Sequence, residues 1–196
     1  PADYLARTYV TDNPFPAGQR HKLTSVDRIN RYTIAHARYH AGFVSIFNEK
    51  RYHDVMLVDA AGNVVYSVSK EADFGQNVLS GPLAETKLGE TVKAALQARG
   101  REVIYSDFAV YSLSNDTISS FAAAPVRSSN GTIVGALVLQ ISTAQLDAVL
   151  DRRHGSEVLL TAYLAGRDGL LRTDLGPTAQ ERALTRKTNA TQLESV

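Results

Sequence analysis

The sequence of 196 residues contains no cysteine and no tryptophan. Without cysteine the chain forms no disulfide, no zinc-thiolate site and no thiol nucleophile, and it tolerates an oxidising compartment. No apolar run approaches the roughly 20 residues that span a bilayer, and no signal-peptide pattern opens the sequence. We therefore expect either a soluble protein or a domain separated from its membrane segments.

An excess of charge of one sign is also missing, because 21 Lys and Arg residues balance 20 Asp and Glu residues along the chain. This balance argues against nucleic acid as a partner. Hydrophobic residues make up 44% of the sequence, a share typical of folded domains. The length allows one full domain and part of a second.

The first fifty residues predict helices. A short helical segment at 4–10 is stopped by NPFPAG (13–18), because prolines do not continue a helix. From about 19 to 48, apolar positions recur every three or four residues and predict one long amphipathic helix. Its expected buried face comprises Leu23, Val26, Thr33, Ala37, Ala41, Val44 and Phe47.

The middle of the chain predicts an antiparallel sheet. Residues 52–70 are typical of a hairpin with its turn at 60–63, and three β-rich segments follow, at 102–112, 117–126 and 132–142. Residues 71–85 lack periodicity, and 88–96 predict a short helix that Gly100 ends as the C′ residue. Another helix follows the capping-box pattern at 142–145. The expected fold class is α+β, with a five-stranded antiparallel sheet and the long N-terminal helix on one face.

The C-terminal part of the chain repeats a feature of the hairpin. The segment LAGRDG (164–169) is similar to LVDAAG (57–62), and residues 157–174 predict strand, turn and strand. No second set of strands follows in the polar tail. We divide the chain into an N-terminal helical segment (1–50), a sheet module (51–153) and the start of an incomplete second module (154–196).

Catalytic motifs are incomplete. Asp73, Phe74 and Gly75 spell the DFG triplet of protein kinases, but the glycine-rich loop and the catalytic loop of kinases are missing. His36 and His40 share a helix face, as in some metal sites, yet no third ligand is evident. We expect no enzyme, no metal and no cofactor. The alternative is a metal-dependent or hydrolytic enzyme that uses His36 and His40.

Strand alternation predicts a pocket between the sheet and a cover formed by residues 70–100. Val64, Tyr66, Val68 and Lys70 would share one face of their strand, and Tyr105, Asp107 and Tyr111 one face of another. An aromatic space with a cation and an anion is typical of small-molecule pockets. We expect the chain to leave the sheet at KEADFG (70–75) as a lid, with Lys70 and Asp73 at the mouth. The predicted ligand-binding residues are Tyr66, Lys70, Asp73, Phe74, Asp107, Tyr111 and Phe121.

Several segments resemble, in order and spacing, the extracytoplasmic double Cache (PDC, PAS-like) sensor region of bacterial chemoreceptors, sensor histidine kinases and membrane-bound cyclases. They are NPFPAG, HARYH, the hairpin with KEADFG, SDFAVY, AAPV and GTIVGALVLQIS, all between about residues 13 and 174. The resemblance implies a PAS-like sheet, a periplasmic location beside an inner membrane, and ligand sensing coupled to a helix shift. The amino-acid-binding signature of some double Cache receptors includes a tryptophan, which this chain lacks.

The expected partners follow from this resemblance and from the long helix. They are a small-molecule ligand, with an organic acid or an amine as plausible classes, and a second copy of the chain bound through the N-terminal helix. Contact with a membrane is expected only through segments outside this sequence. A further alternative is a PAS-type assembly module that binds no ligand.

Overall fold

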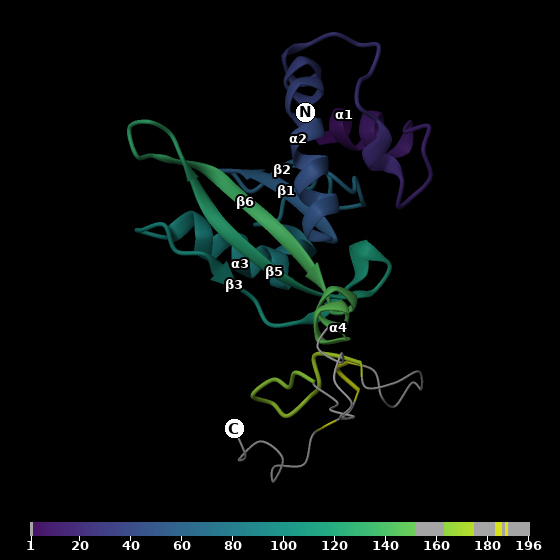
Figure 1. The fold of residues 1–196 in the computed structure, drawn as a ribbon. Coiled ribbons are helices and arrows are strands. Elements are labelled where there is room, and N and C mark those ends of the chain that lie inside the picture. Colours follow the sequence, from purple (N-terminus) through teal and green to yellow (C-terminus); the bar gives the residue numbers. More distant parts are fainter. Residues whose placement is uncertain (1, 152–162, 175–182, 186, 188–196) are drawn as a thin grey trace.

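The computed structural model describes residues 2–151, 163–174, 183–185 and 187, and its fold is shown in Figure 1. The helices are α1 (Ala2–Ala6), continued by a π-helical stretch (Arg7–Thr11), α2 (Arg31–Lys50), α3 (Lys87–Gln97) and α4 (Thr143–Asp151). The strands are β1 (Asp54–Asp59), β2 (Val64–Ser67), β3 (Ile104–Tyr105), β4 (Ala109–Tyr111), β5 (Thr117–Arg127) and β6 (Ile133–Ser142).

All strand pairs of the sheet are antiparallel, in the order β2-β1-β6-β5-β3, with β4 also paired to β5. The predicted α+β fold is therefore confirmed. The sheet has six strands instead of five, because the segment predicted as one strand at 102–112 is interrupted between β3 and β4.

The long helix begins twelve residues later than predicted. Asn30 caps it: its side chain accepts the N–H of Thr33 at 3.0 Å, and the Thr33 hydroxyl accepts the N–H of Asn30 at 2.9 Å. This reciprocal capping box ends the extended chain before the helix. Asn30, a polar residue between the positions Val26 and Thr33 of the predicted buried face, is thus the helix boundary.

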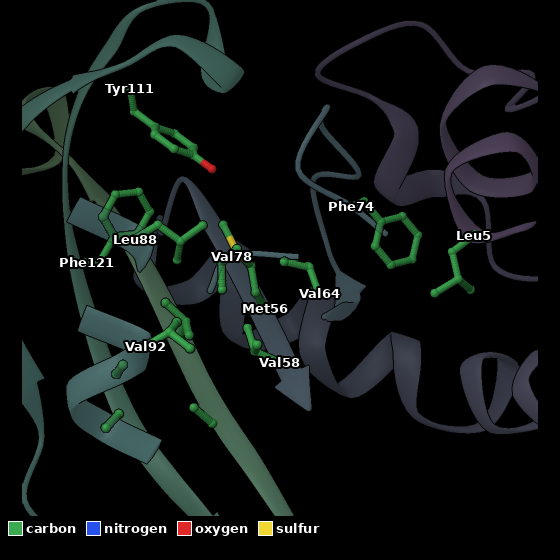
Figure 2. Packing of buried hydrophobic residues seen from close by; sticks show 14 of the residues in the cluster. Leu5, Met56, Val58, Val64, Phe74, Val78, Leu88, Val92, Tyr111 and Phe121 are labelled. Atoms are coloured by element: carbon green, nitrogen blue, oxygen red, sulfur yellow. The ribbon is translucent and has the colours of Figure 1, made fainter. Parts of the chain in front are cut away.

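Two layers cover the sheet (Figure 1). On one face α2 packs through Phe43, Val44 and Phe47 onto Val55, Tyr66 and Val68. Ala37 and Ala41, which we predicted on the buried face, are exposed, and His36 and His40 are buried in their place. The other face carries α3 and a core that includes Met56, Val58, Val78, Leu88, Val92 and Phe121 (Figure 2).

A bulge in the hairpin separates two residues that simple alternation would place together. Leu57 pairs with Tyr66, but the next residue, Val58, pairs with Val64, so that one extra residue lies in β2. An extra residue reverses the side-chain alternation. Val64 therefore lies in the core of the α3 face, whereas Tyr66 lies in the core beneath α2.

The segment of residues 70–86, predicted as part of a lid, follows the outer edge of β2. The N–H of Gly75 donates to the carbonyl of Val64 at 3.0 Å, the N–H of Val64 donates to Gln76 at 2.9 Å, and Val78 donates to Gly62 at 2.8 Å. These bonds satisfy edge groups that would otherwise be open to another chain. The 70–86 segment is therefore an anchored cover of the sheet edge and not a free lid.

The helix α3 ends at Gln97, three residues before the glycine that we predicted as its C′ residue. Ala98 is already extended, with φ −63° and ψ 135°, so Gly100 takes no part in a left-handed cap. Arg127 instead donates from Nη2 to the carbonyl of Ala98 at 2.7 Å. A side chain from β5 thus satisfies a carbonyl at the helix end.

In the second module, Ala165 and Leu171 form an antiparallel bridge around a turn that contains Gly169, and Leu170 pairs with Lys187. The rest of the predicted hairpin and most of the tail lie outside the described residues, so the module boundaries stay predictions. Among the residues that the structure describes, no helix is long and apolar enough to cross a membrane.

Candidate functional site

Lys70 and Asp73, predicted together at a pocket mouth, are both fully buried and belong to two different clusters. Lys70 adopts a left-handed backbone with φ 53°. Its Nζ lies 3.5 Å from His40 Nε2, on the side of α2. Asp73 instead accepts a hydrogen bond from Tyr111, on the side of α3. The cation and the anion therefore do not face one common pocket.

The cluster around Lys70 holds α2 against β2. The Tyr66 hydroxyl lies 2.7 Å from His40 Nδ1, and His40 Nε2 lies 2.7 Å from the carbonyl of His21. Since that carbonyl only accepts, Nε2 donates to it, and in the neutral imidazole Nδ1 then accepts from the Tyr66 hydroxyl. The ring of His36 stacks on His40 with centroids 4.4 Å apart.

Burial governs the protonation of this cluster. Burial and the nearby Lys70 charge lower the pKa of His36 to about 3 and that of His40 to about 4. Burial likewise lowers the pKa of Lys70 to about 8. Both ring nitrogens of His40 are engaged, and the described residues hold no group of three or more potential metal ligands. The geometry gives the histidine pair a packing role.

The second cluster, which we call the acidic site, consists of Asp54, Glu71, Asp73, Tyr111 and Gln140. It lies where the start of the 70–86 segment meets the ends of β1, β4 and β6. Asp54 and Gln140 are paired residues of β1 and β6, and both are fully buried. Sequence reasoning named Asp73 and Tyr111 as ligand-binding residues, but missed Asp54, Glu71 and Gln140.

Both oxygens of the Asp54 carboxylate, in the acidic site, accept hydrogen bonds. Its Oδ1 accepts the N–H groups of Val68 and Ser69, each at 2.9 Å, and that of Val55 at 2.6 Å, while Oδ2 accepts the Ser67 hydroxyl at 2.5 Å. Burial raises the pKa of Asp54 to about 6 despite these bonds, which favour the charged form. Asp54 thereby fixes the turn by which the chain leaves β2.

The Asp73 carboxylate has a hydrogen-bond partner for only one of its two oxygens. The Tyr111 hydroxyl donates to Oδ2 at 2.9 Å, whereas Oδ1 is buried without a hydrogen-bond partner. Burial, together with the neighbouring charges of Asp54 and Glu71, raises the pKa of Asp73 to about 7. A buried acceptor without a donor is uncommon in native proteins and calls for an explanation.

Gln140 provides a second unpartnered acceptor. Its Nε2 donates to Ser114 Oγ at 3.1 Å and to Ser119 Oγ at 2.9 Å. Ser114 in turn donates to Glu71, and Ser119 donates to the carbonyl of Thr117 at 3.3 Å. Since both amide hydrogens are engaged, the orientation of the amide is defined and Oε1 is left buried without a partner.

Aromatic rings border the acidic site. The rings of Tyr111 and Phe121, which we predicted in one pocket, meet edge to face with their centroids 5.0 Å apart. Phe74 is also buried, but its ring lies 5.9 Å from that of Tyr9. In Figure 2 Phe74 is on the side of Leu5, away from Tyr111 and Phe121. The structure therefore joins Asp73, Tyr111 and Phe121, and it separates them from Tyr66, Lys70 and Phe74.

Asp107 lies outside the acidic site. The break between β3 and β4 disrupts the alternation on which our prediction rested, so Tyr105 is 69% exposed while Tyr111 is 3% exposed. The carboxylate of Asp107 binds Arg172 of the second module at 2.7 and 2.6 Å. This hydrogen-bonded ion pair lowers the pKa of Asp107. Asp107 thus connects the segment between β3 and β4 to Arg172 near the C-terminal end of the described residues, a role that strand alternation did not reveal.

Comparisons with known proteins place the fold. Neither a protein-family model nor a functionally curated protein matches the sequence. An extracellular ligand-binding receptor from Desulfohalobium retbaense is similar in structure, with a TM-score of 0.52, 17% identity, and coverage of 88% of this chain and 28% of the receptor chain. The extracellular domain of a candidate histidine kinase has a TM-score of 0.50 at 10% identity, with 96% and 65% covered.

A third similar structure is the ligand-binding domain of the Pseudomonas aeruginosa amino acid chemoreceptor PctC, with a TM-score of 0.49, 16% identity, and 94% and 75% covered. The chain thus spans little more than a quarter of the first receptor. Its fold is that of the extracellular sensor domains of bacterial receptors, which confirms the Cache-like fold expected from the sequence.

Proposed function

We propose that this chain is the extracytoplasmic ligand-sensing domain of a bacterial transmembrane receptor, and that a small molecule binds at the acidic site. One observation carries the proposal: Asp73 Oδ1 and Gln140 Oε1 are both buried without a hydrogen-bond partner. Each unpaired buried acceptor destabilises a fold by about 1–3 kcal/mol. Bound ligand donors would supply the bonds that the protein itself does not make.

The position of the acidic site supports coupling to the helices that lead away from the sheet. Gln140 lies in β6, which runs directly into α4, and α4 lies at the opposite end of the sheet from α1 (Figure 1). From α4, Gln145 donates to the carbonyl of Lys50 at the end of α2, at 2.8 Å. A ligand that binds one arrangement of these elements more tightly would shift their equilibrium.

A thermal-shift screen against organic acids, amines, amino acids and sugars tests this proposal. A true ligand at about 100 times its Kd is expected to stabilise the chain by roughly 2.7 kcal/mol. Tyr111→Phe should weaken the binding of that ligand, because the hydroxyl that orients Asp73 is lost. The matched control is Tyr105→Phe, since Tyr105 is exposed. No stabilisation by any class would instead favour an assembly module that binds no ligand.

We further propose that the chain dimerises through α2, as part of an inner-membrane receptor whose membrane segments lie outside this sequence. Four exposed residues, Ala35, Tyr39, Gly42 and Ile46, follow each other at intervals of four, three and four. This spacing forms one stripe along a helix, as in coiled-coil seams. Tyr39 is 56% and Ile46 46% exposed, and the space around Gly42 is open to a close neighbour.

The double variant Tyr39→Glu/Ile46→Glu is expected to shift the chain from dimer to monomer, because it places like charges opposite each other in the seam. Sedimentation velocity over a range of concentrations measures this shift. Ser45→Glu is the matched control, since Ser45 is exposed on α2 outside the stripe. A wild-type chain that stays monomeric at every concentration would disprove the seam.

A further inference from the structure

A cavity lies between α2 and the hairpin of β1 and β2, on the face of the sheet away from α3. Its volume is about 150 Å³. On the α2 side its wall includes Ala35, His36 and Phe43, and on the hairpin side it includes Leu57 and Tyr66. None of these residues belongs to the acidic site. The cavity is therefore a separate candidate for a binding site.

The wall of this cavity is aromatic and aliphatic, and two of its tyrosine hydroxyls are bonded elsewhere. Tyr32 lines the cavity, and its hydroxyl donates to the carbonyl of Val65 at 2.8 Å. The Tyr66 hydroxyl lies 2.7 Å from His40 Nδ1. The rings of Phe43 and Tyr66 have their centroids 4.9 Å apart. No charged side chain is among the described residues that line the cavity, so a charged ligand would lose its hydration here without compensation.

His36 contributes one polar atom with an unmade hydrogen bond. Its Nδ1 lies 3.3 Å from the carbonyl of Thr24, which only accepts, so Nδ1 carries the hydrogen and Nε2 is an acceptor in the neutral ring. Burial and the nearby Lys70 charge keep the ring neutral, because they lower its pKa to about 3. His36 is 3% exposed, and its Nε2 is buried without a hydrogen-bond partner. A lining residue of this apolar cavity thus holds an acceptor that lacks a donor.

We propose that this cavity binds a small neutral aromatic molecule with one hydrogen-bond donor, of the phenol class, whose hydroxyl donates to His36 Nε2. A cavity of about 150 Å³ with apolar walls accommodates a molecule of the size of benzene. Aromatic rings favour edge-to-face and offset contacts, which Phe43 and Tyr66 offer. A single donor matches the single unpaired acceptor, whereas further polar groups on the ligand would be buried without partners.

A ring in this cavity would contact α2 and the sheet at the same time. The C-terminal end of α2 is joined to α4 by the hydrogen bond from Gln145 to the carbonyl of Lys50. Ala35 and Tyr39 line the cavity and also belong to the proposed dimer stripe on α2. A ligand here would therefore act on the position of α2 by a route that does not pass through the acidic site. The inference rests on the cavity alone and requires no ligand at the acidic site.

Amide NMR signals of the protein, followed during titration with phenol, toluene and benzoate, test this inference. We expect phenol and toluene to shift the signals of α2 and of the hairpin, and benzoate to leave them unchanged. Ala35→Leu, which adds carbon atoms at the cavity wall, should weaken phenol binding at least tenfold. Ala37→Leu, the matched control at an exposed position of the same helix, should not weaken it. His36→Phe should lower the ratio of phenol to toluene affinity about fivefold, because it removes the acceptor.

Other results would overturn the inference. No shift with phenol, or equal phenol binding by Ala35→Leu and the wild type, would show that the cavity does not hold the ring. Shifts confined to β4, β5 and the 70–86 segment would place phenol at the acidic site. An unchanged affinity ratio in His36→Phe would show that His36 does not accept the hydroxyl. Phenol binding that weakens as the protein concentration rises would identify a second copy of the chain as the occupant. The thermal-shift screen tests the sensing function at the acidic site independently of these results.

Discussion

Asp73→Asn is expected to stabilise the protein by roughly 3–4 kcal/mol at pH 8 and to leave its stability nearly unchanged at pH 4. The pKa of Asp73 is about 7 in the folded protein and 3.8 in the reference state. The stability contributed by its proton is thus fully present below pH 3.8 and is lost as the pH rises to about 7. Asparagine carries no charge at any pH and avoids this loss.

Urea unfolding of both proteins at pH 4, 6 and 8 measures the effect. His36 and His40 also titrate in this range, but they contribute to both proteins and cancel in the difference. Asp54 and His53 interact with the charge of Asp73, so the difference includes the change in their own titration. The matched control is Asp27→Asn, which changes an exposed carboxylate. A stability difference that stays constant with pH would show that Asp73 is not held in a desolvated site. A stabilised variant with weakened binding would instead mark Asp73 as a residue retained for function.

Asp54→Ala is expected to destabilise the protein by at least about 3 kcal/mol. It removes the acceptor of three backbone N–H groups and of the Ser67 hydroxyl. Each buried donor left without a partner destabilises by about 1–3 kcal/mol. The turn that leads from β2 into the 70–86 segment would lose the group that organises it. Denaturant unfolding at pH 7 measures the loss.

The variant Asp54→Asn separates the loss of the hydrogen-bond acceptor from the loss of the negative charge. Its amide oxygen can accept the same backbone N–H groups, so most of the stability should be retained. A loss below about 1 kcal/mol in Asp54→Ala would show that water replaces the carboxylate and that the turn does not depend on it. Equal losses in both variants would instead assign the effect to the charge.

The local structure of this chain could be predicted because short-range patterns determine it. The hairpin of β1 and β2, the helix α3 and the helix that follows β6 all correspond to segments with clear periodicity or turn residues. The helix boundary at Asn30 was also encoded locally, by the capping box with Thr33, although apolar spacing alone concealed it. Such signals involve neighbours within about four residues.

Part of the acidic site was also accessible from the sequence. Asp73, Tyr111 and Phe121 were all among the predicted ligand-binding residues, and the structure brings them together. Gln140 could have been found from its own signal, because it is the polar residue inside the apolar run GALVLQIS. Asp54 carries a weaker signal, since acids that begin strands are usually solvated.

The sequence by itself determined the classes of the elements, their order and the Cache-like fold that this order produces. Only the tertiary structure decided which polar side chains meet. A one-residue bulge in β2 and a break between β3 and β4 reverse the faces of the residues beyond them, so Asp107 binds Arg172 and Lys70 turns toward His40. The physical reason is that side chains in a strand alternate between the two faces of the sheet with a period of two. One extra residue therefore moves the side chains beyond it to the opposite face, and pairing across the sheet decides where the extra residue lies.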